Sequence, residues 1–423
     1  MTARTAVRRT PPRYVPSSPS DSPLGESSAQ PRKTAVAGNG ASQSLRVPFY
    51  RHHLGAAEKQ SLLAALDQTF LTTGTLTVEF ERRFADLLGV RRAVGMSSWT
   101  DAARLALLAW GIGPGDEVIT TPLTFIASAN VILHVGATPV LVDVDSKTYL
   151  IDPDAVRQAV TPRSRAILPV HLYGLMCDMC ALREIADRHG LRILEDAAHC
   201  VEGRRDGTGP GGLGDAAAFS FYATKNLTCG EGGAVATRDE SLADRLAVLR
   251  LHGMDKSAAN RHGGRYAHWD MTELGWKANL SNLDAALLLP QLPGVESRLQ
   301  RREAICRRYE AAIAELDGLS VQEIPAGARS ARHLFTILTP PGRRDVYLAE
   351  LQGEGIGVAV NYRAITELTW YQRNRGLWRA ADSLARAEEI GWRTLTLPLY
   401  PTMNDDEVVC VIDALRRVHG RLA

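Results

Sequence analysis

Short apolar segments alternate with helical segments across the first half of the chain, and this alternation constrains the fold more than any other feature. Alternation of this kind predicts a mostly parallel sheet covered by helices on both faces. The expected strands are Ala93–Met96, Glu117–Thr120, Thr138–Val142, Ala166–Pro169, Leu191–Leu194 and Ala216–Phe221. The expected helices are Ala56–Phe70, Val78–Leu88, Asp101–Trp110, Ile126–Val135, Asp154–Val160 and Ala181–His189. Ligands of such sheets bind beyond the carboxyl ends of the strands.

The rest of the chain suggests three parts. Residues 1–44 are rich in Pro, Ser, Arg and Ala without apolar periodicity, which is typical of a disordered extension. We expect residues 45–290 to form a large domain and residues 291–423 a smaller α+β domain. A long amphipathic helix over Asp284–Leu316 is expected at their junction.

Composition excludes several classes of protein. The 423 residues carry 49 Lys+Arg against 47 Asp+Glu, so no general attraction to nucleic acid or an anionic membrane is expected. No apolar run approaches the roughly 20 residues of a membrane span. The cysteines follow no disulfide spacing, and Cys177 and Cys180 lack the second pair that a structural zinc site needs. Prolines follow Arg8-Arg9 where a signal would be apolar. We therefore expect a cytoplasmic protein without a bound metal.

Two charged residues follow strands of the predicted sheet. Asp196 ends the segment Leu191-Arg192-Ile193-Leu194-Glu195-Asp196, and Lys225 comes soon after the strand Ala216–Phe221, in a turn that becomes glycine-rich. A lysine held away from water can lose its proton and form a Schiff base with an aldehyde. A carboxylate at a neighbouring strand end can keep a pyridine nitrogen protonated. This combination is what a pyridoxal 5′-phosphate site requires, although a lone lysine is more often a surface charge.

The order of the short motifs gives a second line of inference. The chain resembles the DegT/DnrJ/StrS family of pyridoxal-phosphate-dependent sugar aminotransferases from about Val47 to about Leu415. The matching blocks are Thr73-Gly74, Phe80-Glu81, Gly115–Ile119, Thr124–Ala127, Val142–Asp145, Pro169–Gly174, Glu195–His199 and Phe219–Gly233. The resemblance implies the fold-type I aminotransferase architecture, with a large cofactor domain and a small C-terminal domain.

The resemblance also implies the residues around the cofactor. Lys225 would hold the aldehyde and shuttle a proton, and Asp196 would pair with the pyridinium nitrogen. Thr100 and Asp101, at a helix start, and Ser220 would bind the phosphate, although Ser97–Asp101 could also be an ordinary capping sequence. The full set of implied cofactor-binding residues is Thr100, Asp101, Phe125, Asp196, His199, Ser220, Lys225 and Asn279.

Three of those residues have specific implied positions. Phe125 would stack on the cofactor ring, or else be a core phenylalanine. His199 would lie near the ring's phenolic oxygen, or else be a core histidine with its bonds satisfied. Asn279 would reach the phosphate of a partner's cofactor, so the resemblance implies a homodimer whose sites are completed in trans.

The acceptor side departs from the family pattern. Trp99 replaces a small residue and is expected to need room, which the substrate cleft could give. Asn361 and Thr366 stand where relatives usually have histidines. His333, Tyr362 and Arg363 are the other candidate substrate residues. Arg363 would either bind a diphosphate or be a solvated surface arginine.

The expected reaction follows from the resemblance. An amino acid, L-glutamate in particular, would donate an amino group to a nucleotide-activated keto-deoxysugar at C4. A cyclitol or another non-nucleotide ketone is the alternative acceptor. A catalytically silent regulatory relative is a second alternative, which the presence of Lys225, Asp196 and Ser220 disfavours.

Overall fold

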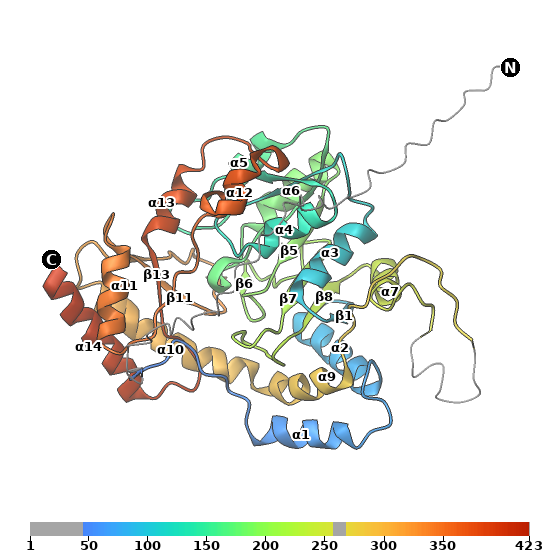
Figure 1. Ribbon diagram of the computed structural model, residues 1–423, viewed down its shortest axis with the longest axis horizontal. Coiled ribbons are helices and arrows are strands. Elements are labelled where there is room, and N and C mark those ends of the chain that lie inside the picture. Colours follow the sequence, from blue (N-terminus) through green and yellow to red (C-terminus); the bar gives the residue numbers. More distant parts are fainter. Residues whose placement is uncertain (1–44, 257–267, 423) are drawn as a thin grey trace, which may run out of the picture. The chain divides into compact units, whose positions relative to one another are not determined.

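The central element of the fold is a large sheet. The computed structural model describes residues 45–256 and 268–422 (Figure 1), and within them eight strands form one sheet in the order β1-β8-β7-β5-β4-β2-β3-β12. These strands are β1 (Arg92–Met96), β2 (Glu117–Thr120), β3 (Thr138–Leu141), β4 (Ser164–Ile167), β5 (Arg192–Asp196), β7 (Ala216–Ser220), β8 (Gly233–Thr237) and β12 (Arg379–Ala380). Only β8 pairs antiparallel, with β1 and β7. The predicted mostly parallel sheet is confirmed.

Helices cover both faces of this sheet because its central strands are apolar on both sides. Along β7, Ala216 and Ala218 pack in the core cluster that includes α3. The alternating residues Ala217 and Phe219 pack in the cluster that includes α2, where the ring centroids of Phe84 and Phe219 lie 5.0 Å apart. Successive side chains of a strand point to opposite faces, so α3 and α2 lie on opposite sides of the sheet.

The helix bounds lie close to those predicted. The helices are α1 (Ala56–Leu66), α2 (Thr75–Leu88), α3 (Trp99–Ala109), α4 (Ala127–His134), α5 (Pro153–Ala159), α6 (Met179–His189), α7 (Glu240–Leu249), α9 (Asn282–Leu288), α10 (Val295–Ile313), α11 (Arg344–Gly353), α12 (Thr369–Arg373), α13 (Ala385–Arg393) and α14 (Asp405–Leu422). Short 3₁₀ turns are η1 (Leu172–Gly174), η2 (Leu289–Gly294), η3 (Ile365–Glu367) and η4 (Arg375–Leu377). The first helix ends at Leu66, four residues earlier than predicted.

The predicted single helix Asp284–Leu316 is wrong. The structure divides this segment into α9, the 3₁₀ turn η2 and α10. Pro290 and Pro293 lie in the turn between the two α-helices. Proline has no backbone N–H and its ring clashes with the preceding turn, so a continuous α-helix is not formed here.

A second, smaller sheet lies in the C-terminal part of the chain. Its strands are β9 (Ser320–Val321), β11 (Phe335–Leu338) and β13 (Thr394–Leu397), paired antiparallel in the order β13-β11-β9. A separate two-stranded antiparallel sheet joins β6 (Arg204–Arg205) and β10 (Ala328–Arg329). Residues of α10, α11 and α14 share a core cluster with the small sheet, and these helices lie beside it in Figure 1.

Two segments connect across the predicted boundary at residue 290. Val47 pairs with Ile356 and is buried in the core of the small sheet, whereas β12 extends the large sheet beside β3. The division into domains 45–290 and 291–423 stays a prediction, and the predicted extension 1–44 lies outside the described residues. Across 45–256 and 268–422, every helix is too short or too polar to cross a membrane.

Candidate active site

The predicted lysine and carboxylate lie near the same edge of the large sheet. Asp196 is the last residue of β5 and Ser220 the last residue of β7, and these neighbouring strands pair Asp196 with Ala218. Lys225 lies in the loop between β7 and β8, where its N–H donates to the Tyr222 carbonyl at 2.9 Å. Parallel neighbours end on the same side, so strand order alone brings the residues of β5 and β7 together.

Asp196 has a fixed, buried carboxylate. Its side chain accepts a hydrogen bond from the Ser128 hydroxyl at 2.7 Å and another from the Ala198 N–H at 3.1 Å. The residue is only 5 % exposed. Burial raises the pKa of the Asp196 carboxyl, and the bonds from Ser128 and Ala198 and the charge of Lys225 oppose this rise. A buried carboxylate of this kind favours a cationic partner.

The side-chain amine of Lys225 has a lowered pKa and no fixed partner among the described residues. Its side chain is partly buried, and across residues 45–256 and 268–422 its ammonium group makes no hydrogen bond or salt bridge. Burial lowers the pKa of Lys225 to about 8, against the opposing effect of the Asp196 charge. A substantial fraction of the amine is therefore neutral just above neutral pH, which is the form that attacks an aldehyde.

Two histidines and a tyrosine form a group beside Lys225. The His199 and His333 rings have centroids 4.4 Å apart, and the Tyr362 hydroxyl lies 3.4 Å from His199 Nε2. Burial, and then the charge of Lys225, lowers the pKa of His199 well below its usual value. Lys225, His333 and Tyr362 line one cleft, together with Asn361. The structure thus brings together residues that are distant in the sequence.

The start of α3 lies against the strand that follows Lys225. Ser98 caps this helix by accepting from the Asp101 N–H at 3.0 Å, which confirms the capping interpretation and leaves a phosphate role open. A Cβ on Gly233 would lie 2.4 Å from the Ser98 carbonyl carbon, so β8 needs glycine there. Gly233 pairs with Ser220, and Thr100 is partly buried at the same helix start.

Trp99 is placed in the core. It is 6 % exposed and belongs to the core cluster of the large sheet, while its indole Nε1 has no partner among the described residues. Its predicted need for room is therefore met by the protein interior. Its role toward substrate stays a prediction.

Two further candidates are exposed. Phe125 is 54 % exposed, and its ring centroid lies 5.9 Å from that of Tyr362, so the alternative of a core phenylalanine is wrong. Arg363 is exposed as well and lies over the Trp392 ring, 5.3 Å from its centroid, with Nε 3.4 Å from Glu367 Oε2. Phe125 is positioned for a ring contact, whereas Arg363 has partners of its own on the surface.

Asn279 is anchored rather than free. Its amide donates to the Thr73 hydroxyl at 2.8 Å and accepts from Lys277, and its backbone bridges to Met96 at the end of β1. These contacts hold the segment that was predicted to complete a partner's site. The role in trans stays a prediction.

Several residues around the site were not found from the sequence. Ser128 contacts Asp196, and Asn226 contacts His333 at 3.1 Å. The Tyr50 hydroxyl donates to the Ala223 carbonyl, which places the first described segment over the Lys225 loop. Asn226 lies beside Lys225 in the matching block, which was a usable signal. Ser128 and Tyr50 lie outside the matching blocks, and their partners are 68 and 173 positions away.

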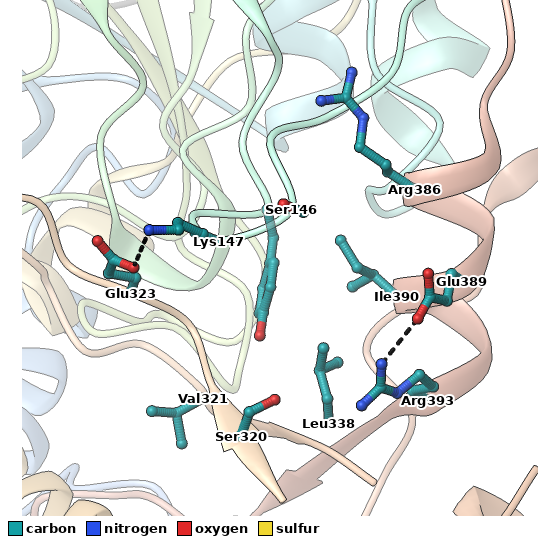
Figure 2. Close-up of a pocket in the computed structure, with 11 residues that line it drawn as sticks. Ser146, Lys147, Ser320, Val321, Glu323, Leu338, Arg386, Glu389, Ile390 and Arg393 are labelled. Carbon is teal, nitrogen blue, oxygen red and sulfur yellow. Dashed lines mark hydrogen bonds and ion pairs between the residues drawn. The ribbon is translucent and has the colours of Figure 1, made fainter. Parts of the chain in front are cut away.

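Another pocket lies elsewhere (Figure 2). It is lined by Ser146, Lys147, Tyr149, Ser320, Val321, Glu323, Leu338, Arg386, Glu389, Ile390 and Arg393. None of the predicted site residues lines it. Its basic side chains are engaged in ion pairs, such as Lys147 with Glu323 and Arg393 with Glu389. The Lys225 cleft is therefore the better candidate for the active site.

Comparison with known proteins agrees with this geometry. The sequence profile of the DegT/DnrJ/EryC1/StrS aminotransferase family matches residues 52–416. The spore coat polysaccharide biosynthesis protein SpsC of Bacillus subtilis (strain 168) is 43% identical over 378 residues, which cover 88% of this chain and 97% of SpsC.

Solved structures are similar over most of the chain. The putative sugar aminotransferase Spr1654 from Streptococcus pneumoniae matches with a TM-score of 0.83 and 30% identity, covering 89% of this chain and 100% of that one. DesV of S. venezuelae matches with a TM-score of 0.79 and 38% identity, covering 86% of this chain and 95% of that one. The fold around the Lys225 cleft is therefore that of a sugar aminotransferase.

Proposed function

We propose a donor and an acceptor for this protein, which belongs to the DegT/DnrJ/EryC1/StrS aminotransferase family and is a pyridoxal-phosphate-dependent sugar aminotransferase. It moves an amino group from L-glutamate to C4 of a nucleotide-activated keto-deoxysugar. The observation that carries the proposal is the position of Lys225 and the buried carboxylate of Asp196 near the same edge of the sheet, with burial lowering the pKa of Lys225 to about 8.

The residues present fit the cofactor. The described structure gives the Lys225 amine no hydrogen-bond partner, and Asp196 holds a buried negative charge that only a cation would balance well. When bound, pyridoxal phosphate supplies an aldehyde and an electron-withdrawing ring. Lys225 would bind the aldehyde, Asp196 the ring nitrogen, and the start of α3 with Ser220 the phosphate. Burial raises the pKa of Asp196, and a positive partner beside its carboxylate would oppose that rise.

The side chains of the site have separate roles in the proposed reaction. Lys225, once its amine is free, carries a proton from the donor's α-carbon and later returns one to the acceptor. Ser128 holds Asp196 in place through its 2.7 Å bond. Phe125 would cover one face of the ring, and His199 would lie near the ring's oxygen. Lys225 and Asp196 are thus the catalytic pair, and the others position what they act on.

The acceptor is the finer part of the proposal. The name of SpsC assigns that relative to polysaccharide biosynthesis, a process that consumes activated sugars. The segment Lys225-Asn226-Leu227-Thr228-Cys229 resembles the branch of the family that aminates at C4. Tyr362, His333 and Arg363 would contact the sugar nucleotide, with Trp99 behind the site.

Single-turnover reactions test the acceptor. The enzyme is first converted to its aminated form with glutamate and then mixed with each member of a panel of keto sugar nucleotides and with a free cyclitol ketone. We expect the fastest reaction with a 4-keto-deoxysugar nucleotide, and NMR of the product to place the new amine at C4. A faster reaction with the free cyclitol ketone than with every sugar nucleotide would refute this acceptor and favour the alternative.

We also propose a homodimer whose sites are completed in trans by Asn279. The support is the family resemblance of the loop that carries Asn279, which Thr73 holds in place. Mixing inactive Lys225→Ala chains with impaired Asn279→Asp chains should restore activity, because one site of the mixed dimer contains neither change. An active monomer in sedimentation at the assay concentration would rule this out. A cytoplasmic location stays a prediction.

A further inference from the structure

A buried ion pair between Glu202 and Arg302 contacts the loop that carries Lys225, through Asn226. Arg302 Nη2 lies 2.7 Å from Glu202 Oε1, and each side chain is only 2 % exposed. Arg302 also donates to the Ala331 carbonyl at 3.1 Å. Taking two charges out of water costs roughly what their attraction returns, so such a pair is weak evidence for a stabilising role. A role in fixing the orientation of a neighbouring group is the better explanation.

That neighbouring group is the amide of Asn226. Its Nδ2 donates to Glu202 Oε2 at 2.9 Å and to the Ala331 carbonyl at 3.1 Å. Both partners are acceptors only, so the reversed amide would face two acceptors with its own oxygen and lose both bonds. The Asn226 oxygen must therefore face away from Glu202.

The Asn226 oxygen in turn decides where His333 carries its proton. Asn226 Oδ1 lies 3.1 Å from His333 Nδ1 and can only accept, so Nδ1 is the protonated nitrogen. Burial lowers the pKa of His333 well below its usual value, which keeps the ring neutral. Its Nε2 then has a free lone pair, and across residues 45–256 and 268–422 no protein group bonds to it.

The neighbouring His199 is held as the other neutral tautomer, with its proton on Nε2 rather than Nδ1. His199 Nδ1 accepts from the Tyr173 N–H at 3.3 Å, so His199 carries its proton on Nε2, the atom 3.4 Å from the Tyr362 hydroxyl. Two neighbouring neutral rings, tilted by 35° to each other, therefore present different groups to the same region, a donor on His199 and an acceptor on His333.

We propose that Glu202, Arg302 and Asn226 are positioning residues that hold His333 with its proton on Nδ1, so that His333 Nε2 accepts a hydrogen bond from a hydroxyl of the acceptor sugar in the Lys225 cleft. The sugar part of this inference rests on the proposed function, whereas the proton position does not. A buried site that bonds a substrate hydroxyl discriminates strongly against analogues without it. This chain of hydrogen bonds from Glu202 through Asn226 to His333, called the relay below, therefore contributes to acceptor specificity and leaves the donor reaction unchanged.

The proton position is measured first, on protein without substrate. Histidine labelled with ¹⁵N gives long-range proton–nitrogen spectra that distinguish the two neutral forms, and loss of one signal set in His333→Gln assigns His333. We expect the Nδ1-protonated form in the unaltered protein. Asn226→Leu should lose this preference. His333 protonated on Nε2 in the unaltered protein would overturn the relay, whatever the acceptor is.

Kinetics then test the sugar contact. Asn226→Leu should lower kcat/KM for the keto sugar nucleotide about tenfold, while the glutamate half-reaction changes less than about twofold. The matched control is Gln291→Leu, since buried Gln291 anchors the same loop through Thr228 without touching His333. The control should lose stability but keep the His333 spectrum and the ratio of the two half-reactions. Equal losses in both half-reactions of Asn226→Leu would overturn the proposed sugar contact.

Discussion

The two halves of the Lys225 cleft differ in how their residues are held. On the cofactor side, Asp196 and Ser220 end adjacent buried strands, and Asp196 has two fixed hydrogen bonds. On the acceptor side, Tyr362 and Arg363 lie outside helices and strands, and Arg363 is exposed. A sheet edge fixes positions with little freedom, whereas loops can change without unfolding the core. The difference explains how one fold can keep a single chemistry while its acceptors vary.

The largest effect is expected for Lys225→Ala. Removing the only group proposed to move the proton should lower turnover at least about 10³-fold and abolish the visible absorption of the bound cofactor. Absorption spectra and glutamate half-reaction rates measure both. Lys147→Ala, which alters an exposed lysine in another pocket, is the control. Unchanged activity and absorption in Lys225→Ala would remove the basis of the comparison.

Asp196→Asn should separate chemistry from stability. The ring nitrogen would lose its ionic partner, so we expect turnover to fall about 10²–10⁴-fold. Burial already opposes the charge of Asp196, and the amide oxygen can still accept from Ser128. The cofactor-free variant should therefore unfold at the same temperature as the unaltered protein or higher, as followed by circular dichroism. A large loss of thermal stability would mean that the charge is structural.

The pH dependence of cofactor binding should reflect Lys225. Its folded pKa of about 8 lies below its usual value, so the neutral amine increases as pH rises toward 8. The rate at which cofactor-free protein reacts with pyridoxal phosphate should rise nearly tenfold per pH unit below about 8 and level off above it. Stopped-flow absorbance measures this rate. A midpoint near 10.5 would show that the Lys225 amine behaves as an exposed lysine.

The smallest effect is expected on the acceptor side. Arg363→Ala removes an exposed charge that already contacts Glu367 and Trp392, so kcat/KM for the keto sugar nucleotide should fall only a few-fold. The glutamate half-reaction should not change. Single-turnover rates of the two half-reactions provide the test. A loss as large as that of Asp196→Asn would mean that Arg363 belongs to the fixed half of the site.

The sequence predicted the fixed half better than the variable half for a physical reason. Strand ends follow from apolar periodicity, which is local, so the neighbourhood of Asp196 and Lys225 could be inferred from the alternation of elements. The antiparallel strand β8 was not predicted, because Gly233–Thr237 is short and shows no clear alternation. The break at Pro290 and Pro293 was a signal that was present and was not used.

Contacts between distant segments could not be read from local patterns. His333 meets Asn226 across 107 positions, and Tyr362 meets His199 across 163. The buried pair of Glu202 and Arg302 spans 100 positions. Such contacts depend on how the small sheet and α10 pack beside the large sheet. For the same reason the burial of Trp99 required the folded chain.

The central claim is that the cofactor is attached to Lys225. The most direct measurement is borohydride reduction of the protein with one equivalent of pyridoxal phosphate, followed by mass spectrometry of its peptides. We predict a single modified lysine, Lys225, and loss of that modification in the presence of glutamate. Modification of another lysine, such as Lys147 or Lys277, with Lys225 unmodified would contradict the claim.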